Sequence, residues 1–397
     1  MKFIPIPVLL IVVFVATQQV NSQQEKPPAP ERSQVVYPNL LSIAMGLNLG
    51  TPRVSLQPDT LYTSYDLNSK LVKLLPDGFE NKINSFYLPE GYMAVFAENN
   101  DGSGESSCFV ALDGAIAANL PARLRNKISF VRYLRVNNPN KRGSAQGADK
   151  ISSSWYYNWG SRALSFERQQ YVPMTWGKTT ATDENVRILT DRKDIDHLLS
   201  FNEPDHKEQA NIPVDTAVAR YKIMLKTGLR IGSPVTTQDN FSSTSWRAQF
   251  MNGADAAKLR VDYITLHWYD WGNETITGAT DSLTAVGVFN RFVSHIKKAR
   301  ATYPGKPIWV TEYNANRKRT SANVHRIFMK LSTAWMNESA QNYIERYVYF
   351  FPPELPALNS DKSPTLLGEY WKNISSPNSF SGNIINDDTI FKFKLAT

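Results

Sequence analysis

Apolar and polar positions follow two different patterns along the chain. Before residue 136, short apolar runs such as 92–96 and 108–112 are separated by Gly and Asn, which is typical of β-strands joined by turns. After residue 150, apolar runs alternate with amphipathic stretches such as 216–227 and 283–301, which predict helices. We therefore expect an all-β region followed by a region in which parallel strands alternate with helices.

Seven apolar runs in the second region have the length of strands. They span residues 155–159, 171–176, 197–201, 229–233, 263–267, 308–311 and 347–351. This alternation predicts a (β/α)8 TIM-like barrel, which is small or truncated because no eighth run is evident.

The remaining segments have the composition of a signal peptide, a flexible leader and a linker between domains. Residues 1–22 hold a basic residue, an apolar run and a small-residue site, which predict a signal peptide and a secreted protein, either extracellular or in a cell wall or periplasm. Residues 23–39 predict a flexible leader and residues 137–150 a linker, because both are rich in polar residues with Pro or Gly. The predicted domains are the β domain at 40–136 and the barrel at 151–397.

The β domain contains an internal repeat. Residues 81–86 read NKINSF, and residues 126–130 read NKISF, starting 45 positions later. With Gly91 and the aromatic residues after it, this repeat resembles the βγ-crystallin Greek-key pair over residues 40–136. Many such domains bind calcium through paired Asn or Asp, but Glu80 and Arg125 precede the two repeats here. A β module that packs or binds glycan is therefore favoured over a calcium site.

Composition excludes several function classes. The chain has one cysteine, so no internal disulfide is expected, and its formal charge of +8 comes from Lys and Arg that are scattered along the sequence. We therefore expect neither nucleic acid nor membrane as a partner, and a monomer. Glycosylation sequons at Asn240, Asn273, Asn337 and Asn373 predict a glycoprotein if the source is a eukaryote.

Two glutamates follow predicted strands within polar and aromatic clusters. Glu203 lies in FNEPD (201–205) and Glu312 in VTEYN (310–314), while HWYD (267–270) follows a third strand. Residues just past the carboxyl ends of barrel strands line the active face. A carboxylate pair there is the requirement for cleaving a glycosidic bond with retention, which needs neither metal nor cofactor. Taken singly, each glutamate could be a surface residue at a strand end.

Five motifs together resemble glycoside hydrolase family 128. They are WYYNW (155–159), VPMTWG (172–177), FNEPD (201–205), HWY (267–269) and TEY (311–313), and the resemblance covers about residues 147–375. It implies a compact clan A barrel that hydrolyses β-1,3-glucan with retention. It also implies that Glu203 is the acid/base, Glu312 the nucleophile, and Asn202 a contact of the sugar beside the scissile bond.

Aromatic and amide side chains in these motifs suit a sugar, whose apolar ring faces stack on aromatic planes. The predicted sugar-binding residues are Trp155, Tyr156, Asn158, Trp159, Trp176, Asn202, His267, Trp268, Tyr269 and Tyr313. Each aromatic residue could instead belong to the core, since aromatic residues often do. We expect His267 to orient Glu312, and the nearby negative charge to raise the pKa of Glu203 so that it donates a proton.

Two alternatives remain open at this stage. Another clan A β-glycanase, acting on β-1,4-glucan or mannan, would use the same two glutamates with different subsites. A lectin that binds β-glucan without cleaving it would use the aromatic residues and the β domain, but would have no need of both carboxylates.

Overall fold

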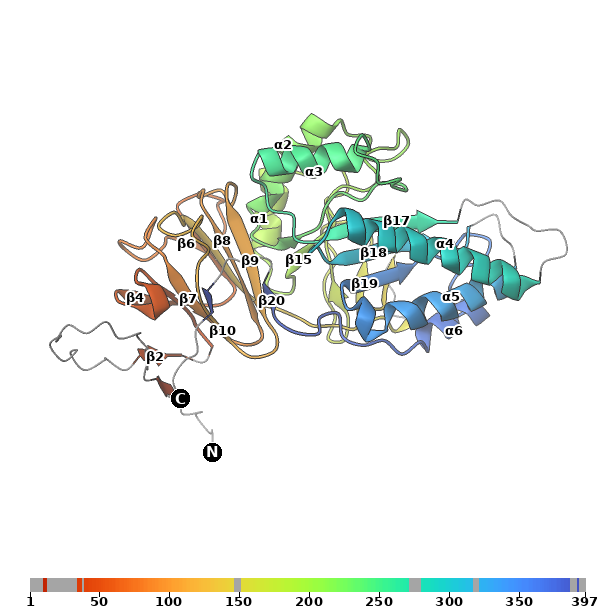
Figure 1. Cartoon of the computed structure of the whole chain (residues 1–397), viewed down its shortest axis with the longest axis horizontal. Coiled ribbons are helices and arrows are strands. Elements are labelled where there is room, and N and C mark those ends of the chain that lie inside the picture. Colours follow the sequence, from red (N-terminus) through yellow and green to blue (C-terminus); the bar gives the residue numbers. More distant parts are fainter. Residues whose placement is uncertain are drawn as a thin grey trace, which may run out of the picture.

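The computed structural model describes residues 10–12, 34–37, 39–145, 151–270, 280–316, 321–385 and 391–392. Figure 1 shows a β-rich part beside a second part in which helices flank parallel strands. Across the described ranges, no helix is long and apolar enough to span a lipid bilayer. Most of the predicted signal peptide and leader lies outside the described residues. Within those segments, β1 (Leu10–Val12) pairs antiparallel with β2 (Gln34–Val36).

Two sheets form the β-rich part. The first contains β3 (Leu41–Ala44), β4 (Arg53–Leu56), β7 (Ser85–Leu88) and β10 (Ile116–Asn119), with the 3-10 helix η1 (Leu47–Leu49) beside it. The second contains β5 (Thr60–Thr63), β6 (Val72–Lys73), β8 (Tyr92–Ala97), β9 (Ser106–Ala111) and β11 (Phe130–Arg135). Because side chains alternate across a strand, both sheets contribute to one core, in which Phe86 packs against Phe96 and Phe109.

The two copies of the repeat form matching turns. Asn81 and Asn126 both adopt a left-handed backbone, with φ of 57° and 56°, which Asn tolerates better than most residues. The N–H of Asn81 donates to the carbonyl of Ile128, and the N–H of Asn126 donates to the carbonyl of Ile83. The copies therefore close on each other, as expected for a duplicated motif.

Eight parallel strands form a ring in the described part of the second region. They are β12 (Gly143–Ala145), β13 (Trp155–Tyr157), β14 (Gln170–Tyr171), β15 (His197–Leu198), β16 (Arg230–Ile231), β17 (Ile264–Tyr269), β18 (Ile308–Asn314) and β19 (Ile344–Tyr349). Parallel ladders join β12 to β13 and β14, β15 to β16, and β17 to β18 and β19. Parallel bridges join the remaining neighbours, at Met174–Leu199, Gly232–Tyr263 and Arg142–Tyr347. The strand that the sequence pattern does not show is β12.

Helices follow most of the later strands. They are α1 (Asp183–Thr190), α2 (Val214–Leu225), α3 (Trp246–Ala256), α4 (Asp281–Thr302), α5 (Ala322–Met336) and α6 (Leu366–Lys372), with the 3-10 helix η3 (Ser339–Gln341) before β19. Helices α2 and α4 coincide with the two amphipathic stretches of the sequence. Inside the ring, Trp155, Tyr263 and Trp309 pack together, and the rings of Tyr263 and Trp309 stack at 4.3 Å.

Two boundaries differ from those predicted. Residues 143–145 of the predicted linker form β12, and the guanidinium of Arg142 donates to the carbonyls of Ile151, Ser152 and Ile374. This end of the linker is therefore part of the ring, while residues 146–150 lie outside the described residues. At the other end of the chain, β20 (Ile384–Ile385) and β21 (Phe391–Lys392) pair with β9 and β10. The last segment of the predicted barrel thus returns to the β-rich part.

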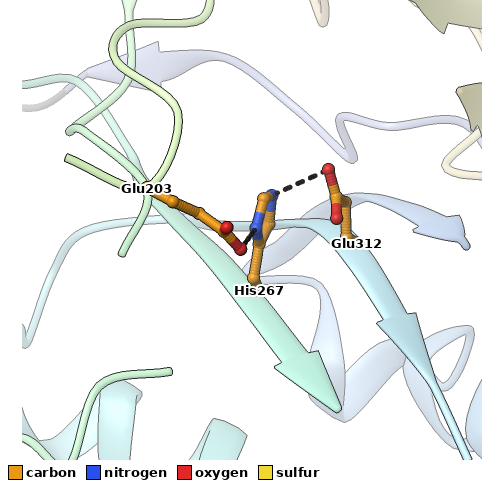
Figure 2. Close-up of side chains that lie close together, drawn as sticks. All are labelled: Glu203, His267 and Glu312. Atoms are coloured by element: carbon orange, nitrogen blue, oxygen red, sulfur yellow. Dashed lines mark hydrogen bonds and ion pairs between the residues drawn. The ribbon is translucent and has the colours of Figure 1, made fainter. Parts of the chain in front are cut away.

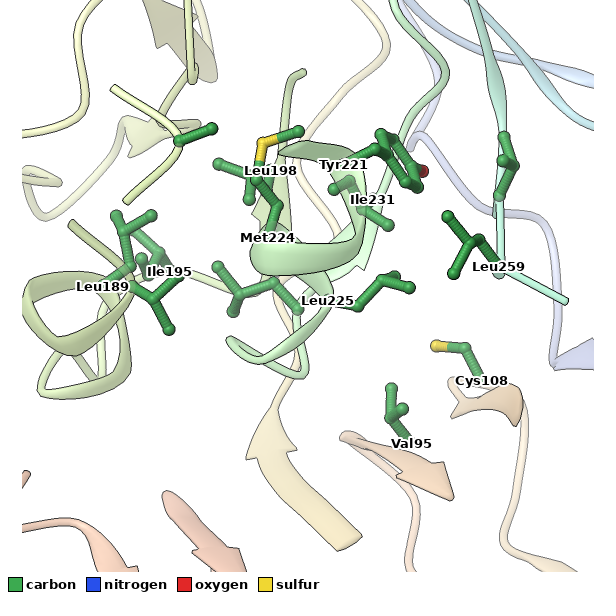
Figure 3. Close-up of a cluster of buried hydrophobic side chains, with 14 of the residues drawn as sticks. Val95, Cys108, Leu189, Ile195, Leu198, Tyr221, Met224, Leu225, Ile231 and Leu259 are labelled. Carbon is green, nitrogen blue, oxygen red and sulfur yellow. The ribbon is translucent and has the colours of Figure 1, made fainter. Parts of the chain in front are cut away.

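A continuous apolar core joins the two parts. Val95 and Cys108 of the β-rich part lie in the same cluster as Leu225 and Leu259, which precede β16 and β17 (Figure 3). Gly228 has φ of 62°, and a Cβ there would lie 2.4 Å from Cβ of Arg132. The close approach of the two parts therefore requires glycine at this position. The β-rich part covers the end of the ring at which the strands begin.

Candidate active site

Three ionisable side chains meet at the opposite end of the ring, where the strands finish. Glu203 follows β15, His267 lies in β17 and Glu312 lies in β18 (Figure 2). One carboxylate oxygen from each glutamate and one ring nitrogen of His267 lie within 4.8 Å of one another. The exposed fractions are 7% for Glu203, 6% for Glu312 and 1% for His267. The two carboxylates that the sequence singles out are therefore close together and largely removed from water.

Glu203 has a strained backbone. Its φ of 44° lies in the left-handed region, which residues other than glycine seldom adopt. Its N–H donates to the carbonyl of Val235 at 2.7 Å, and its carbonyl accepts the N–H of His206 at 3.1 Å. Such strain persists only where surrounding contacts impose it, and it is concentrated at functional sites.

A β-bulge directs Glu312 into the ring. Leu266 of β17 pairs with Val310 of β18, but the next residue, His267, pairs with Glu312, so Thr311 is the extra residue. Without the bulge, strict alternation from the inward-facing Trp309 would turn Glu312 outward. The bulge therefore places Glu312 beside His267.

Three donors hold the Glu312 carboxylate. The hydroxyl of Tyr157 at 3.2 Å and Nε1 of Trp159 at 3.1 Å donate to Oε1, and the hydroxyl of Tyr269 donates to Oε2. Burial, followed by the negative charge of Glu312, raises the pKa of Tyr157 and Tyr269 well above the ordinary value. Both hydroxyls therefore stay protonated and donate hydrogen bonds to the Glu312 carboxylate, which are strong, charge-assisted interactions.

His267 lies between the two glutamates. Its Nδ1 is 2.9 Å from Oε1 of Glu203, and its Nε2 is 3.5 Å from Oε1 of Glu312. Burial lowers the pKa of His267, but the charge of Glu312 and the hydrogen bond and charge of Glu203 outweigh burial, and the net pKa is raised. The surroundings therefore favour the protonated ring.

The pKa of Glu203 shifts in the direction opposite to the prediction. Burial raises this pKa, but the hydrogen bond and positive charge of His267, together with the charge of His206, outweigh burial and lower it. The predicted rise was wrong because it considered only the two carboxylates. A cation between them reverses the balance.

The site opens into a cavity of about 570 Å³. It is lined by Trp159, Trp176, Asn202, Glu203, His206, Glu208, Gln209, Thr237, Tyr269, Glu312, Asn314, Phe350 and Pro353. Aromatic rings beside amides and carboxylates suit a sugar, which has apolar faces and polar edges. Oδ1 of Asn202 is buried and has no hydrogen-bond partner among the described residues, so it can accept a hydrogen bond from a ligand hydroxyl.

Of the ten predicted sugar-binding residues, Asn202, Trp159, Trp176 and Tyr269 line this cavity and the other six do not. Tyr156, Trp268 and Tyr313 lie on the outer side of the ring, where they pack into apolar clusters with residues of the helices. The residues next to them in sequence point inward. Tyr157 follows Tyr156, His267 and Tyr269 flank Trp268, and Glu312 precedes Tyr313. The two-residue period of a strand explains these corrections.

Trp155, Asn158 and His267 lie outside the cavity lining for other reasons. Trp155 points inward but deeper in the ring, where its Nε1 donates to the carbonyl of Lys141. Asn158 is exposed, and its Oδ1 accepts hydrogen bonds from Gly160 N–H and the Tyr171 hydroxyl. His267 contacts the two carboxylates rather than the cavity wall.

Sequence reasoning missed several residues of the site. Tyr157 was not among the predicted residues, although its spacing from Trp155 places both on the inner side of β13. The cavity residues His206, Glu208, Gln209, Thr237, Asn314, Phe350 and Pro353 were also missed. Most follow the carboxyl end of a strand, which is the position that could have identified them.

Glu203, His267 and Glu312 are also the kinds of residue that hold metal ions, and among the described residues they form a cluster of suitable spacing. The ring nitrogen that faces Glu203 is engaged in a hydrogen bond. We assign no ion to this cluster.

Comparison with known proteins defines the class. Residues 135–371 match the family model described as glycosyl hydrolase catalytic core. This match spans more than half of the chain, and the chain belongs to that family. It is a glycoside hydrolase, and the match begins before β12 and leaves most of the β-rich part outside.

Solved structures similar to this chain belong to one glycoside hydrolase family. A variant of the subgroup I endo-β-1,3-glucanase of glycoside hydrolase family 128 from Amycolatopsis mediterranei, in complex with laminaripentaose, is 26% identical with a TM-score of 0.50, over 59% of this chain and 99% of that one. A second variant of that enzyme, in complex with laminarihexaose, is 26% identical with a TM-score of 0.51, over 59% and 100%. The family resemblance indicated by the motifs is thereby confirmed. The chain has no match among the curated proteins.

Proposed function

We propose that this chain cleaves β-1,3-glucan internally and with retention, using Glu312 as nucleophile and Glu203 as acid/base. The observation that carries the proposal is the carboxylate pair, which has one oxygen from each glutamate within 4.8 Å of the other. Retaining glycosidases place their carboxyl groups about 5–5.5 Å apart, whereas inverting enzymes leave about 6.5–9.5 Å for a water molecule. The spacing supports the retaining reaction.

The solved structures support the substrate. Both similar structures are endo-β-1,3-glucanases in complex with laminari-oligosaccharides. In this chain, Trp159 and Trp176 supply rings for stacking at the cavity wall. Asn202 supplies an amide that can bind a hydroxyl of the sugar undergoing reaction, a contact that strengthens as positive charge develops on the ring.

The reaction proceeds in two displacements. Glu312, held by its three donors, attacks the anomeric carbon while Glu203 gives a proton to the departing oxygen. Glu203 then takes a proton from the water that attacks the covalent intermediate. The buried, low-dielectric site strengthens these electrostatic interactions.

We also propose the finer features of the fold and location. The ring of eight parallel strands is a small (β/α)8 barrel, and the paired repeats are a Greek-key unit attached beneath it. Secretion is supported by the sequence of residues 1–22 and by two sequon residues, Asn240 and Asn373, that are exposed. The protein acts as a monomer.

The test is release of reducing ends by the purified protein from β-1,3-glucan, β-1,4-glucan and mannan in parallel. We expect cleavage of β-1,3-glucan and loss of that cleavage in the Glu312→Gln variant. Preference for β-1,4-glucan or mannan would support another β-glycanase. Binding to glucan with no cleavage of any substrate would support the lectin.

A further inference from the structure

His267 is the side-chain partner of Glu203. Within the described ranges, the Glu203 carboxyl group makes one side-chain hydrogen bond, with Nδ1 of His267. Glu312, in contrast, has donors from Tyr157, Trp159 and Tyr269. The nitrogen of His267 that faces Glu312 is farther away, at 3.5 Å, and makes no hydrogen bond with a described residue. His267 is therefore the hydrogen-bond partner of Glu203 rather than of Glu312, whereas the sequence led us to expect that it orients Glu312.

The charged groups around His267 favour a cation there. Glu203 faces it from the end of β15, and Glu312 faces it from β18. The charge of Arg247 in α3 opposes protonation, but Arg247 is itself paired with Asp239 at 2.9 Å. A neutral ring would leave two carboxylates of the same charge close together in a buried site, and such an arrangement is costly.

We propose that His267 stores the proton that Glu203 delivers to the departing glycosidic oxygen, so that the two side chains act as one acid with a single proton. This inference rests on the proposed function, because it requires Glu203 to be the acid/base. His267 acts through Glu203 and is therefore a positioning residue.

The first displacement balances with one proton. The bond between the anomeric carbon and the departing oxygen breaks, and a bond between that carbon and an oxygen of Glu312 forms. The proton of Nδ1 passes to Oε1 of Glu203, and the departing oxygen takes this same proton from Glu203. The site then holds a neutral imidazole, an ionised Glu203 and an ester at Glu312.

The second displacement restores the site. Water attacks the anomeric carbon, the ester bond breaks, and the water proton passes through Glu203 to Nδ1 of His267. Before and after each step the three side chains together carry one net negative charge. The buried surroundings therefore never have to accommodate a change in net charge, and little reorganisation is needed.

The direct test is NMR of the intact protein with isotope-labelled histidine. The chain has five histidines, so the signal of His267 is assigned by its loss in a His267→Asn variant, or by elimination with variants of the other four. We expect a protonated ring in the free protein at neutral pH. We expect a neutral ring after the protein is trapped as a covalent ester with a β-glucoside fluorinated beside the anomeric carbon. A His267 ring that is neutral in both states overturns the proposal.

The kinetic test compares His267→Asn with the wild type over a range of pH. Asn can donate a hydrogen bond to Glu203 but cannot be ionised, so Glu203 alone must hold the proton. The high-pH limb of kcat/KM should move to lower pH by up to about 2 units, the difference between ordinary His and Glu pKa values. His325→Asn is the matched control, because His325 is also buried and contacts the Tyr349 hydroxyl instead of a carboxylate. Its pH limb should not move.

A change of substrate separates proton delivery from a loss of structure. With unactivated glucan, His267→Asn should lower kcat/KM by about 10²- to 10⁴-fold, the usual contribution of general acid catalysis. With a dinitrophenyl β-glucoside, which departs without a proton, the loss should be less than about tenfold. Equal losses on both substrates, with an unmoved pH limb, overturn the proposal. Absence of hydrolysis by the wild type would instead contradict the proposed function itself.

Discussion

His197 and His267 make the same kind of contact at opposite ends of the strand ring, with opposite results. Nδ1 of His197 is 2.7 Å from Asp196, and Nδ1 of His267 is 2.9 Å from Glu203. Burial lowers the pKa of both rings. For His197 burial prevails, aided by the charges of Arg346 and Arg230, and the pKa is lowered, whereas for His267 the second carboxylate prevails and the pKa is raised.

The comparison teaches that the wider set of charges, rather than the nearest contact, decides what a buried histidine does. At the end where strands begin, Arg230 binds Glu345 through two hydrogen bonds of 2.7 and 2.9 Å, and the β-rich part covers the surface. That end is built for stability. At the other end, two carboxylates share one ring beneath an open cavity, which suits proton transfer.

The largest expected effect comes from the carboxylates of the catalytic end. Glu312→Gln and Glu203→Gln should each lower kcat by about 10³-fold or more, because amides neither attack the sugar nor transfer the proton. Reducing-end release measures the loss, and both variants should remain folded, because Gln has nearly the same size as Glu.

Asp205→Asn is the control for these variants, since Asp205 is exposed in the same motif and accepts hydrogen bonds from Thr237. Its activity should stay close to that of the wild type. Unfolding of either glutamine variant would show that the glutamates are structural.

Asp196→Asn should affect stability rather than catalysis. Burial raises the pKa of Asp196, but the charge and hydrogen bond of His197 outweigh burial and lower it. Because the folded pKa lies below the unfolded value of about 3.9, the stabilisation is complete above that pH and is lost as pH falls through the folded pKa. Because the pKa of His197 is lowered, the substitution mainly removes hydrogen bonds to a charged group, which costs about 1.5–3 kcal/mol.

Denaturant unfolding at several pH values measures this effect. The variant should unfold more easily at neutral pH and show a weaker dependence of stability on acid. An unchanged stability, with kcat/KM reduced as in the Glu203 variant, would contradict the division between the two ends.

Trp159→Phe should have a smaller effect, confined to catalysis. The substitution keeps an aromatic ring but removes the Nε1–H that donates to Glu312. A hydrogen bond to a charged group contributes about 1.5–3 kcal/mol, so kcat/KM should fall by about 10- to 10²-fold. Trp176→Phe is the matched comparison, because Trp176 lines the same cavity but, among the described residues, makes no hydrogen bond with Glu312. A similar loss there would mean that ring area, rather than the donor, matters.

Gly228→Ala should lower stability by about 1–3 kcal/mol and leave kcat/KM unchanged. The cost combines a positive φ with the clash against Arg132. Gly114→Ala separates these causes, because Gly114 also has a positive φ but its Cβ would meet no atom within 4 Å. Thermal or denaturant unfolding measures both variants, and equal losses would remove the interface from the explanation.

The two glutamates and Asn202 could be predicted because strand ends of a parallel ring converge whatever lies between them in sequence. Strand β12 could not, since three residues with small side chains give no apolar run, and its place is set by its neighbours β13 and β19. Tyr157 and the bulge at Thr311 depend on which face of a strand each residue occupies. A single irregularity reverses that assignment, so pattern alone does not determine it.

Electrostatics was the least predictable property. The direction of the Glu203 pKa depends on His267, which is 64 residues away in sequence, and on the distance between the ring and each carboxylate. Only the folded arrangement provides those distances.

The most direct test of the two-displacement reaction is the anomeric form of the sugar first released from a β-1,3-gluco-oligosaccharide, observed by proton NMR before the anomers equilibrate. The close carboxylate pair and the donors around Glu312 predict that the β-anomer appears first. Initial release of the α-anomer would contradict the covalent intermediate, and with it the roles given to Glu203, His267 and Glu312.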